Sequence, residues 1–573
     1  LAVLVLGALL VRGSVYALRG DYLGWDEALY LLMAQNILDG SGVTLNGLPH
    51  IALSPFVAVV TALVSRVSGL ELLTAYRSLM TLAAASFLIP VWYLMRLHAG
   101  EHVARIGALL LVGWPALIDM APKLGPMWRN LYAGSEPLFL ALLFTSFAIG
   151  EAALRQRGPR RYGLSALAGV SLAFGFLTRP EAVVIAAVYA AIRFLPGYQV
   201  ERPRVHAAAI GVAATAFLLV AGPHLVHLRQ ATGSWTLSGR YEPARLSADL
   251  YQDLVRDDRH MGAYLRTWWA LDPGHSYLVN PYWGVDAAAP VERRLTQFAQ
   301  VIEAEGHDAS GTSGTGLKRF AIYFAALWML TGPFYLLFVL VGFTRRETDM
   351  QNRFPPFVLA AFVASWLTAW QIFVLPRFFL YLVPALALWG ARGVILAAGF
   401  VRARGLGINV PDRLIPVALT VVGIVLTGRV ALTSEPASLR QVGMDNRLAA
   451  ERLTAVLPPN EPVFTWHPRL AYWGHLDWRA LPVASLDAVA HYGALRGVRF
   501  FFLARGGYSP VELTAPYVLL TMDPEVASRL RRISSRDSVH EHPPLELVPV
   551  EPIAGFPTGR IGLAPDSVVR PAP

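Results

Sequence analysis

Long apolar runs separated by short polar loops constrain the fold of this chain more than any other feature. About eleven runs have lengths of roughly 14–25 residues, which suit helices that cross a bilayer or nearly do so. They lie near residues 1–18, 75–97, 103–119, 135–154, 162–178, 181–195, 207–228, 318–342, 354–371, 378–400 and 413–432. Charged residues make up only 15% of the chain, against about 25% in soluble domains. We therefore predict a mostly α-helical, polytopic membrane protein, with a transmembrane bundle of about 11 spans in residues 1–432.

The apolar segment 52–68 differs from these runs. Its Ser54, Pro55 and Arg66 leave a poor core for crossing a bilayer. If it did cross, loops rich in arginine would fall on opposite sides of the membrane. We therefore predict a helix that lies in the membrane interface.

The distribution of basic residues predicts the orientation of the helices. One set of short loops holds fifteen arginines, whereas the opposite short loops hold six arginines and lysines in total. Because cytoplasmic loops are enriched in basic residues, the first set is predicted to face the cytoplasm. The loop 19–74, the long loop 229–317 and the tail 433–573 then lie outside, in a multi-pass protein of the inner (plasma) membrane. This asymmetry accounts for the net charge of +10 without a nucleic-acid partner.

The tail 433–573 has a different composition from the rest of the chain. It combines proline-rich turns such as "LPPNEPVF" with short apolar stretches such as "RFFFLA" and "YVLLTM". The stretch "DNRLAAERLTAVLPPN" has the pattern of an amphipathic helix that prolines terminate. Alternating helix and strand patterns predict a small extracytoplasmic α/β domain. Because the chain has no cysteine, disulfides, thiolate nucleophiles and Cys-ligated metals are excluded throughout.

Two adjacent acids, Asp26 and Glu27, follow the first apolar run in "GWDEALYLLMAQNIL". Acids in the first turn of a helix are stabilised by the helix dipole, by about 0.3–1 kcal/mol. The pair could therefore serve only as a helix cap. An ionised aspartate beside the membrane is also suited to act as a general base toward an incoming hydroxyl group. The residues alone leave both interpretations open.

Glu136 opens the fourth apolar run in "GSEPLFLALLF", after Ser135 and before Pro137. These three residues have the pattern of a helix start, with an N-cap, an acid in the first turn and an early proline. Acids at membrane depth are costly, however, so Glu136 is also a candidate functional residue. It is predicted to lie on the same side of the membrane as Asp26.

Two isolated cations lie on that side as well. Arg179 and Glu181 interrupt the hairpin between the fifth and sixth runs in "GFLTRPEAVV". Arg377 lies in "LPRFFLYLVPAL", with Tyr381 one turn further on. A turn with a local ion pair would explain Arg179. Arginine also recognises phosphate through its fork of donors, so both arginines are candidate phosphate ligands.

Five segments, taken in order, resemble the GT-C superfamily of membrane glycosyltransferases. They are "WDEALYLLMAQNIL", "AYRSLMTLAAASFLIPVWYLMRLHAG", "SEPLFLALLF", "GFLTRPE" and "RFFLYLVPAL". The resemblance is to the dolichyl-phosphate-mannose protein mannosyltransferase and aminoarabinose-transferase-like group, which includes bacterial transferases of lipopolysaccharide sugars. It covers about residues 1–400, and its most specific motif is the Asp26–Glu27 pair with Tyr30 three residues after the glutamate.

The resemblance implies a sugar donor carried on a polyprenyl phosphate and an inverting transfer to an acceptor hydroxyl outside the cytoplasm. Asp26 then corresponds to the catalytic acid of the first outer loop, and Glu136 to a second acid for which some members have aspartate. Arg179 corresponds to the basic residue near the donor phosphate, which is often lysine in relatives. Arg377 is similar to a basic or aromatic residue at the mouth of a late span, and both are expected to bind substrate. The remaining residues of the expected site are Glu27, Tyr30 and Tyr381. Some members use a divalent cation and others do not, so neither a cofactor nor a metal ligand is assigned.

Two other classes of protein compete with this interpretation. A secondary transporter would show matched halves with broken helices near the membrane midplane, and the two halves of this sequence do not mirror each other. A non-catalytic scaffold that displays the tail domain would leave Asp26 as a helix cap. The gathering of charged residues on one predicted face argues against a transporter. The resemblance implies a glycosyltransferase that moves a hexosyl or pentosyl group. The sugar and the acceptor, whether lipid, glycan or protein hydroxyl, are not specified by any motif.

Overall fold

The structure is a computed structural model, and part of the chain is described below. The described residues are 1–45, 48–51, 53–117, 134–199, 202–232, 235–239, 316–344, 350–371, 376–404, 414–432, 436–455, 457–465, 467–481, 493, 497–504, 517–521 and 547–549. They divide into two units. The first lies within Leu1–Thr44, His50–Asp249 and Thr312–Met444, and the second within Leu45–Pro49, Leu250–Gly311 and Asp445–Pro573. Most of the predicted outer loop 229–317, and with it residues 240–315, lies outside the described residues.

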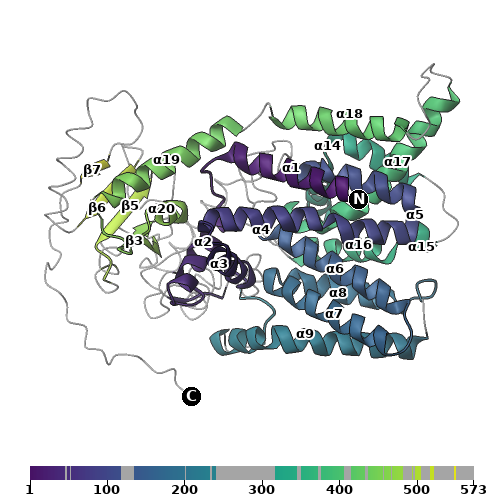
Figure 1. Cartoon of the computed structure of the whole chain (residues 1–573), viewed down its shortest axis with the longest axis horizontal. Helices are drawn as coiled ribbons and strands as arrows, with labels where there is room; N and C mark the ends of the chain where they lie inside the picture. Colours follow the sequence, from purple (N-terminus) through teal and green to yellow (C-terminus); the bar gives the residue numbers. More distant parts are fainter. Residues whose placement is uncertain are drawn as a thin grey trace. The chain divides into compact units, whose positions relative to one another are not determined.

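The first unit is a bundle of helices that run alongside one another (Figure 1). Its long helices are α1 (Ala2–Arg19), α4 (Leu72–Ser86), α5 (Leu88–Val112), α6 (Glu136–Leu154), α7 (Pro159–Thr178), α9 (Pro203–Thr232), α14 (Gly316–Phe343), α16 (Pro356–Gln371), α17 (Val383–Ala403) and α18 (Leu414–Leu432). Its shorter elements are α2 (Trp25–Leu38), α3 (Phe56–Ser68), the 3₁₀ helix η1 (Pro115–Leu117), α8 (Glu181–Ile192), α15 (Met350–Arg353) and the 3₁₀ helix η4 (Pro376–Leu382). The predicted mostly α-helical bundle is therefore confirmed.

The number of membrane crossings differs from the prediction. Within the described ranges, five helices are long and apolar enough to cross a membrane, or six if the bent α14 counts as one span. Two of the predicted runs fall in one continuous stretch, Leu72–Val112, which turns at Gly100 with φ 84° and ψ 168°. The helices α3 and α8 have 13 and 12 residues, which is short for a bilayer whose apolar core is about 30 Å thick. The predicted count of eleven is not confirmed.

The run predicted as one span at 318–342 is broken. The two parts of α14, Tyr323–Gly332 and Phe334–Phe343, meet at an angle of 111°. Gly332 has φ 65° and ψ 170°, a conformation that side chains disfavour, and the proline that follows has no backbone N–H to continue the helix. Hydropathy alone did not reveal the break because both parts are apolar.

Close backbone contacts hold several helices of the bundle together. A Cβ atom built at Gly393 of α17 would overlap the carbonyl of Phe338 in α14, and one at Gly342 of α14 would overlap the carbonyl of Trp389. Gly169 of α7 approaches the backbone of Ala213 in α9 in the same way. In a bilayer, where apolar side chains gain little by leaving lipid, such small residues allow the dispersion contacts that join helices.

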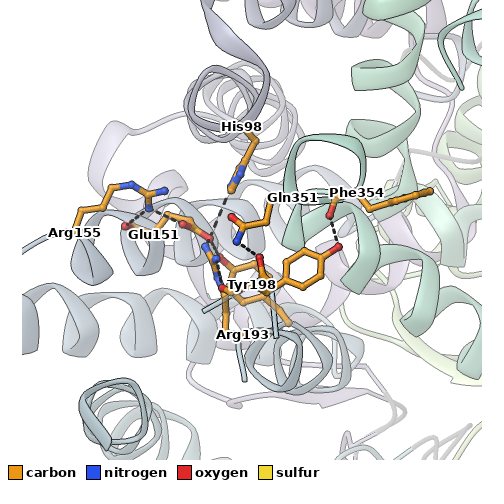
Figure 2. A network of polar contacts seen from close by, with 9 residues as sticks. His98, Glu151, Arg155, Arg193, Tyr198, Gln351 and Phe354 are labelled. Atoms are coloured by element: carbon orange, nitrogen blue, oxygen red, sulfur yellow. Dashed lines mark hydrogen bonds and ion pairs between the residues drawn. The ribbon is translucent and has the colours of Figure 1, made fainter. Parts of the chain in front are cut away.

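A buried polar network joins the helices at the end of α6 remote from Glu136 (Figure 2). Its centre is Glu151, which is fully buried, accepts a hydrogen bond from Arg155 Nη1 at 2.7 Å and forms an ion pair with Arg193 after α8. Tyr198, whose carbonyl accepts from Arg193 at 3.0 Å, donates to the carbonyl of Phe354 at 2.9 Å. A buried carboxylate is tolerated because these donors compensate its lost hydration. The sequence analysis did not single out this network.

The second unit contains a five-stranded mixed sheet. Its strands are β3 (Pro462–Thr465), β4 (Asp477–Ala480), β5 (Phe500–Ala504), β6 (Tyr517–Thr521) and β7 (Leu547–Pro549), in the order β4-β3-β5-β6-β7. The neighbours are parallel except for the antiparallel pair β5 and β6. The helix α20 (Pro468–Trp473) connects β3 to β4, and the sheet core holds Phe464, Phe500 and Phe501. A two-stranded sheet pairs β1 (Thr44–Leu45) with β2 (Leu48–Pro49).

This sheet confirms the α/β character predicted for the tail. The helix predicted from "DNRLAAERLTAVLPPN" is the C-terminal part of α19 (Pro436–Thr454), which ends before Pro458. The predicted division of the chain at residue 433 remains a prediction, as does the extracytoplasmic position of the tail.

Candidate active site

The start of α2 separates the two acids of the "WDEALY" motif. Gly24 is the N-cap in an extended conformation, and Glu27 occupies the third helical position. The Glu27 carboxylate accepts a hydrogen bond from the Gly24 N–H at 2.8 Å, and its side chain is buried. This is the acid half of a capping box, in which the third residue satisfies a backbone donor that the helix leaves unpaired. Capping therefore explains Glu27.

Asp26 has a different partner. Its Oδ2 accepts a hydrogen bond from Nη1 of Arg377 in η4 at 2.8 Å. The two side chains are 21% and 24% exposed and 351 positions apart in the sequence. The structure therefore brings together the predicted base and one of the two predicted phosphate ligands.

Glu136 and Arg179 form a second ion pair. Nη1 of Arg179 lies 2.6 Å from Oε1 of Glu136, and Nη2 lies 3.1 Å from Oε1 of Glu181. The other Glu136 oxygen accepts from the Gly134 N–H at 3.0 Å. Burial would lower the pKa of Arg179, but the carboxylates of Glu181 and Glu136 raise it overall, so the guanidinium group stays charged. The predicted local ion pair between Arg179 and Glu181 is present, and Arg179 also forms an ion pair with Glu136.

The aromatic ring of Phe378 connects the two ion pairs. The guanidinium carbon of Arg179 lies 5.5 Å from the ring centroid, and that of Arg377 lies 5.6 Å from it. We call Asp26, Glu136, Arg179 and Arg377 the paired-charge cluster. Its members come from α2, α6, the α7–α8 hairpin and η4, so one point in the bundle collects residues from four remote segments.

The predicted tyrosines are both buried. Tyr30 of α2 is 3% exposed and contributes to raising the pKa of Arg179, which places it near the cluster. Tyr381 is 2% exposed and lies in η4, the same element as Arg377. The hydroxyl of Tyr76, which the sequence analysis did not select, donates to the Gly134 carbonyl at 3.0 Å and so supports the start of α6.

The start of α6 follows the predicted pattern only in part. Ser135 is the N-cap and Pro137 lies in the first turn, as expected, but the Ser135 side chain makes no capping hydrogen bond. Glu136 is turned toward Arg179 and the Gly134 N–H instead. The helix start is thus built around a carboxylate whose main partner is an arginine.

The chemistry of this arrangement is that of an anion site with acids beside it. The side chains of Arg179 and Arg377 are only 10% and 24% exposed, so water screens their charge less than in bulk and they can attract a phosphate. In the part of the chain that the structure describes, no three His, Asp or Glu side chains are grouped to hold a metal ion. Asp26 and Glu136 each face an arginine, so this donor set does not fit a divalent cation and we derive no step through one.

The fold can be compared with solved structures. The helical bundle and the mixed α/β unit are similar in fold to solved membrane proteins of the GT-C type. One similar solved structure is ArnT from Cupriavidus metallidurans in the apo state, with a TM-score of 0.51, 14% sequence identity, and coverage of 88% of this chain and 92% of that chain. Another is the archaeal oligosaccharyltransferase AglB from Archaeoglobus fulgidus in complex with an inhibitory peptide and a dolichol-phosphate. Its TM-score is 0.50 and its identity 11%, over 87% of this chain and 69% of that chain.

The sequence comparisons are negative. No protein-family model matches this chain, and no curated protein matches it in sequence. The structural likeness at 11–14% identity therefore concerns the fold. The resemblance seen in the motifs is confirmed at that level.

Proposed function

We propose that this protein is a membrane glycosyltransferase that moves a sugar from a polyprenyl-phosphate donor to an acceptor hydroxyl outside the cytoplasm, with inversion. The observation that carries the proposal is the paired-charge cluster on a GT-C fold. Two arginines and two acids that are remote in sequence meet at one place, and this supports the roles that we propose for them. The AglB structure is described as a complex with a dolichol-phosphate, which supports a lipid phosphate as the donor class here.

In the proposed reaction, the donor phosphate binds to Arg179 and Arg377. Each arginine is paired with a carboxylate in this structure. When the phosphate binds, it replaces Glu136 as the partner of Arg179 and Asp26 as the partner of Arg377. This exchange conserves charge pairing at low dielectric and releases the Asp26 carboxylate. Donor binding thereby prepares the base.

The acceptor oxygen then attacks the anomeric carbon from the face opposite the phosphate. The new C–O bond forms as the bond between the anomeric carbon and the phosphate oxygen breaks, and its electron pair leaves with the polyprenyl phosphate. Asp26 takes the hydroxyl proton. The leaving phosphate needs positive charge more than it needs a proton, and the arginines supply that charge. Inversion follows from a single displacement, as in inverting glycoside chemistry.

The proposed setting is the outer face of the inner membrane. The donor lipid cannot leave the bilayer, so base and phosphate ligands must lie at its interface. The acceptor is proposed to be bound by the outer loop 229–317 and the tail 433–573, because neither holds any of the motifs assigned to the donor. Whether the acceptor is a lipid, a glycan or a protein hydroxyl is left to experiment.

The test is transfer from a synthetic polyprenyl-phosphate sugar by detergent-purified protein. We expect Arg179→Ala to lower turnover by about 10²–10³-fold, the usual effect of removing one donor to a developing anion. Arg160→Ala is the matched control, because Arg160 is exposed at the start of α7 and should be nearly neutral. Arg179→Lys, which keeps the charge but loses the fork, should fall between them.

Thermal melting of each variant distinguishes loss of chemistry from loss of fold. Since Arg179→Ala also leaves Glu136 buried without its cation, a lower melting temperature is expected for it, and a smaller change for Arg179→Lys. Equal turnover in Arg179→Ala and Arg160→Ala would refute the phosphate role. Absence of transfer by the unaltered protein with every donor sugar tried would favour the scaffold.

A further inference from the structure

Arg77 is a charged residue inside a long helical stretch that the proposed mechanism does not use. It lies in α4, within the apolar segment "LLTAYRSLMTLAAAS", and its side chain is 16% exposed. A charged group at such a position costs free energy unless it is paired or functional. The contacts of Arg77 show how it is paired.

The guanidinium group of Arg77 binds the linker between α1 and α2. Nη1 donates to the Gly20 carbonyl at 2.7 Å, and Nη2 donates to the Tyr22 carbonyl at 2.9 Å. Nε lies 3.9 Å from the carboxylate of Glu27, which caps α2. The group also lies over the ring of Tyr16 in α1, 5.5 Å from its centroid. One side chain therefore contacts the end of α1, the linker and the start of α2.

The same linker is fixed from a second direction. A Cβ atom built at Gly443 of α19 would overlap the backbone of Asp21 and Tyr22. Gly20 has φ 56° and ψ −127°, so the chain makes a sharp turn there that a side chain would strain. The turn, the close approach of Gly443 and the two hydrogen bonds of Arg77 together leave the linker little freedom.

We propose that Arg77 is a positioning residue that sets the place of the Asp26 carboxylate by holding the linker and the first turn of α2. This inference rests on the proposed function, since it assigns Arg77 a part in the same reaction. Arg77 touches none of the reacting groups. It acts through Glu27, the neighbour of Asp26, and through the two carbonyls that precede α2 in the chain.

Arginine is required at this position by geometry. The planar guanidinium group has five donors and can bind both carbonyls while it lies 3.9 Å from the Glu27 carboxylate. A lysine presents a single point charge instead. Arg77→Lys should therefore keep the charge but release at least one of the two carbonyls. The charged groups around Asp26 are then unchanged in number: Arg377 and Arg179 as cations, and Glu27, Glu136 and Glu181 as anions. Only the distances from Asp26 to these groups are then expected to change.

The first test needs no transferase activity. Because the natural chain lacks cysteine, Asp26→Cys introduces a single thiol at the position of the base. The rate of its alkylation as a function of pH gives the pKa of that thiol, which nearby Arg377 holds low. Adding Arg77→Lys should raise this pKa by about one unit, since α2 shifts the thiol away from the cation. Adding Arg96→Lys is the control, because Arg96 is 57% exposed and pairs with Glu101.

The second test uses turnover. Arg77→Lys should lower kcat by about 10²-fold, the cost expected for a small misplacement of a catalytic group, with the donor KM and melting temperature nearly unchanged. In an Asp26→Asn background the same change should cost nothing further, because the group that it positions is already inactive.

Three results would overturn the proposal. They are an unchanged thiol pKa in Arg77→Lys, an equal loss of turnover in the Asp26→Asn background, and a loss explained by the melting temperature alone. If Arg77→Lys does not yield folded protein, Arg77→Gln, which keeps one carbonyl hydrogen bond, replaces it in both tests. Should the protein prove to have no transferase activity, the thiol measurement still decides the positioning role while the proposed function fails by itself.

Discussion

Asp26 and Glu27 are adjacent in sequence, yet their carboxylates have different partners. Glu27 caps α2 at Gly24, and Asp26 pairs with Arg377. Helix capping is therefore assigned to Glu27, and Asp26 carries the role in catalysis that we propose. The cap is the glutamate at the third helical position, where a long side chain can reach back to the N-cap. The aspartate is left to face the cations.

This division predicts opposite behaviour for two conservative variants. Asp26→Asn should keep the fold, because a partly exposed ion pair contributes only about 0–1 kcal/mol. It should lose about 10²–10⁴-fold in transfer, because an amide cannot take the acceptor proton. Glu27→Gln should lose less activity, since its amide oxygen can still accept from Gly24. Turnover of a polyprenyl-phosphate sugar and thermal melting measure both effects. Full turnover by Asp26→Asn would remove the main support for Asp26 as the base.

The individual charges of the site were predictable, but their pairing was not. Asp26, Glu136, Arg179 and Arg377 are conspicuous because each charge stands beside apolar residues. Their partners lie 43 and 351 positions away, and no local pattern encodes such contacts. Arg77 and Glu151 have the same property, a charge within an apolar run, although no motif marks them. An isolated charge within an apolar run is informative even when the run is long.

At the scale of elements, apolar periodicity located the helices better than it located their breaks. The start of α6 was predicted to within a residue, and Arg179 was correctly placed in the turn before α8, which begins at Glu181. Gly332, by contrast, turns the chain within a stretch that stays apolar on both sides. Such turns depend on a single backbone conformation, which side-chain hydropathy does not report. The lower number of long apolar helices has this origin in part, together with the shortness of α8.

The contact between α14 and α17 gives a prediction at this scale. Gly393→Ala should lower the melting temperature by several degrees, because its new methyl group meets the Phe338 carbonyl and forces the helices apart, at a cost of about 1–3 kcal/mol. Gly399→Ala is a matched control on the same helix. No atom lies within 4 Å of a Cβ built there, so the change should be neutral or stabilising by up to about 1 kcal/mol. Equal melting temperatures of the two variants would contradict the close packing.

At the scale of the whole molecule, the fold depends on pattern more than on residue identity. This chain is superposable with ArnT over 88% of its length at 14% identity. A membrane bundle requires apolar faces, small residues at helix contacts and a few charges in fixed places, and many sequences meet those requirements. The fold class could therefore be predicted from the sequence. The long outer loop could not, because it has neither periodicity nor a motif.

The orientation of the bundle is the remaining prediction at this scale, and it rests on the arginine distribution. The helix α18 covers the last of the predicted spans, residues 413–432, so its two ends are predicted to lie on opposite sides of the membrane. A reporter that is active only outside the cytoplasm should be inactive when fused after Arg404, on the arginine-rich side, and active when fused after Ser434. A reporter active only in the cytoplasm should give the reverse pattern. The fusion after Ser434 is the more informative one, because Asp26 and the tail are predicted to lie on the same side of the membrane. Cytoplasmic activity after Ser434 would reverse the orientation and place the paired-charge cluster on the face where no extracytoplasmic acceptor can reach it.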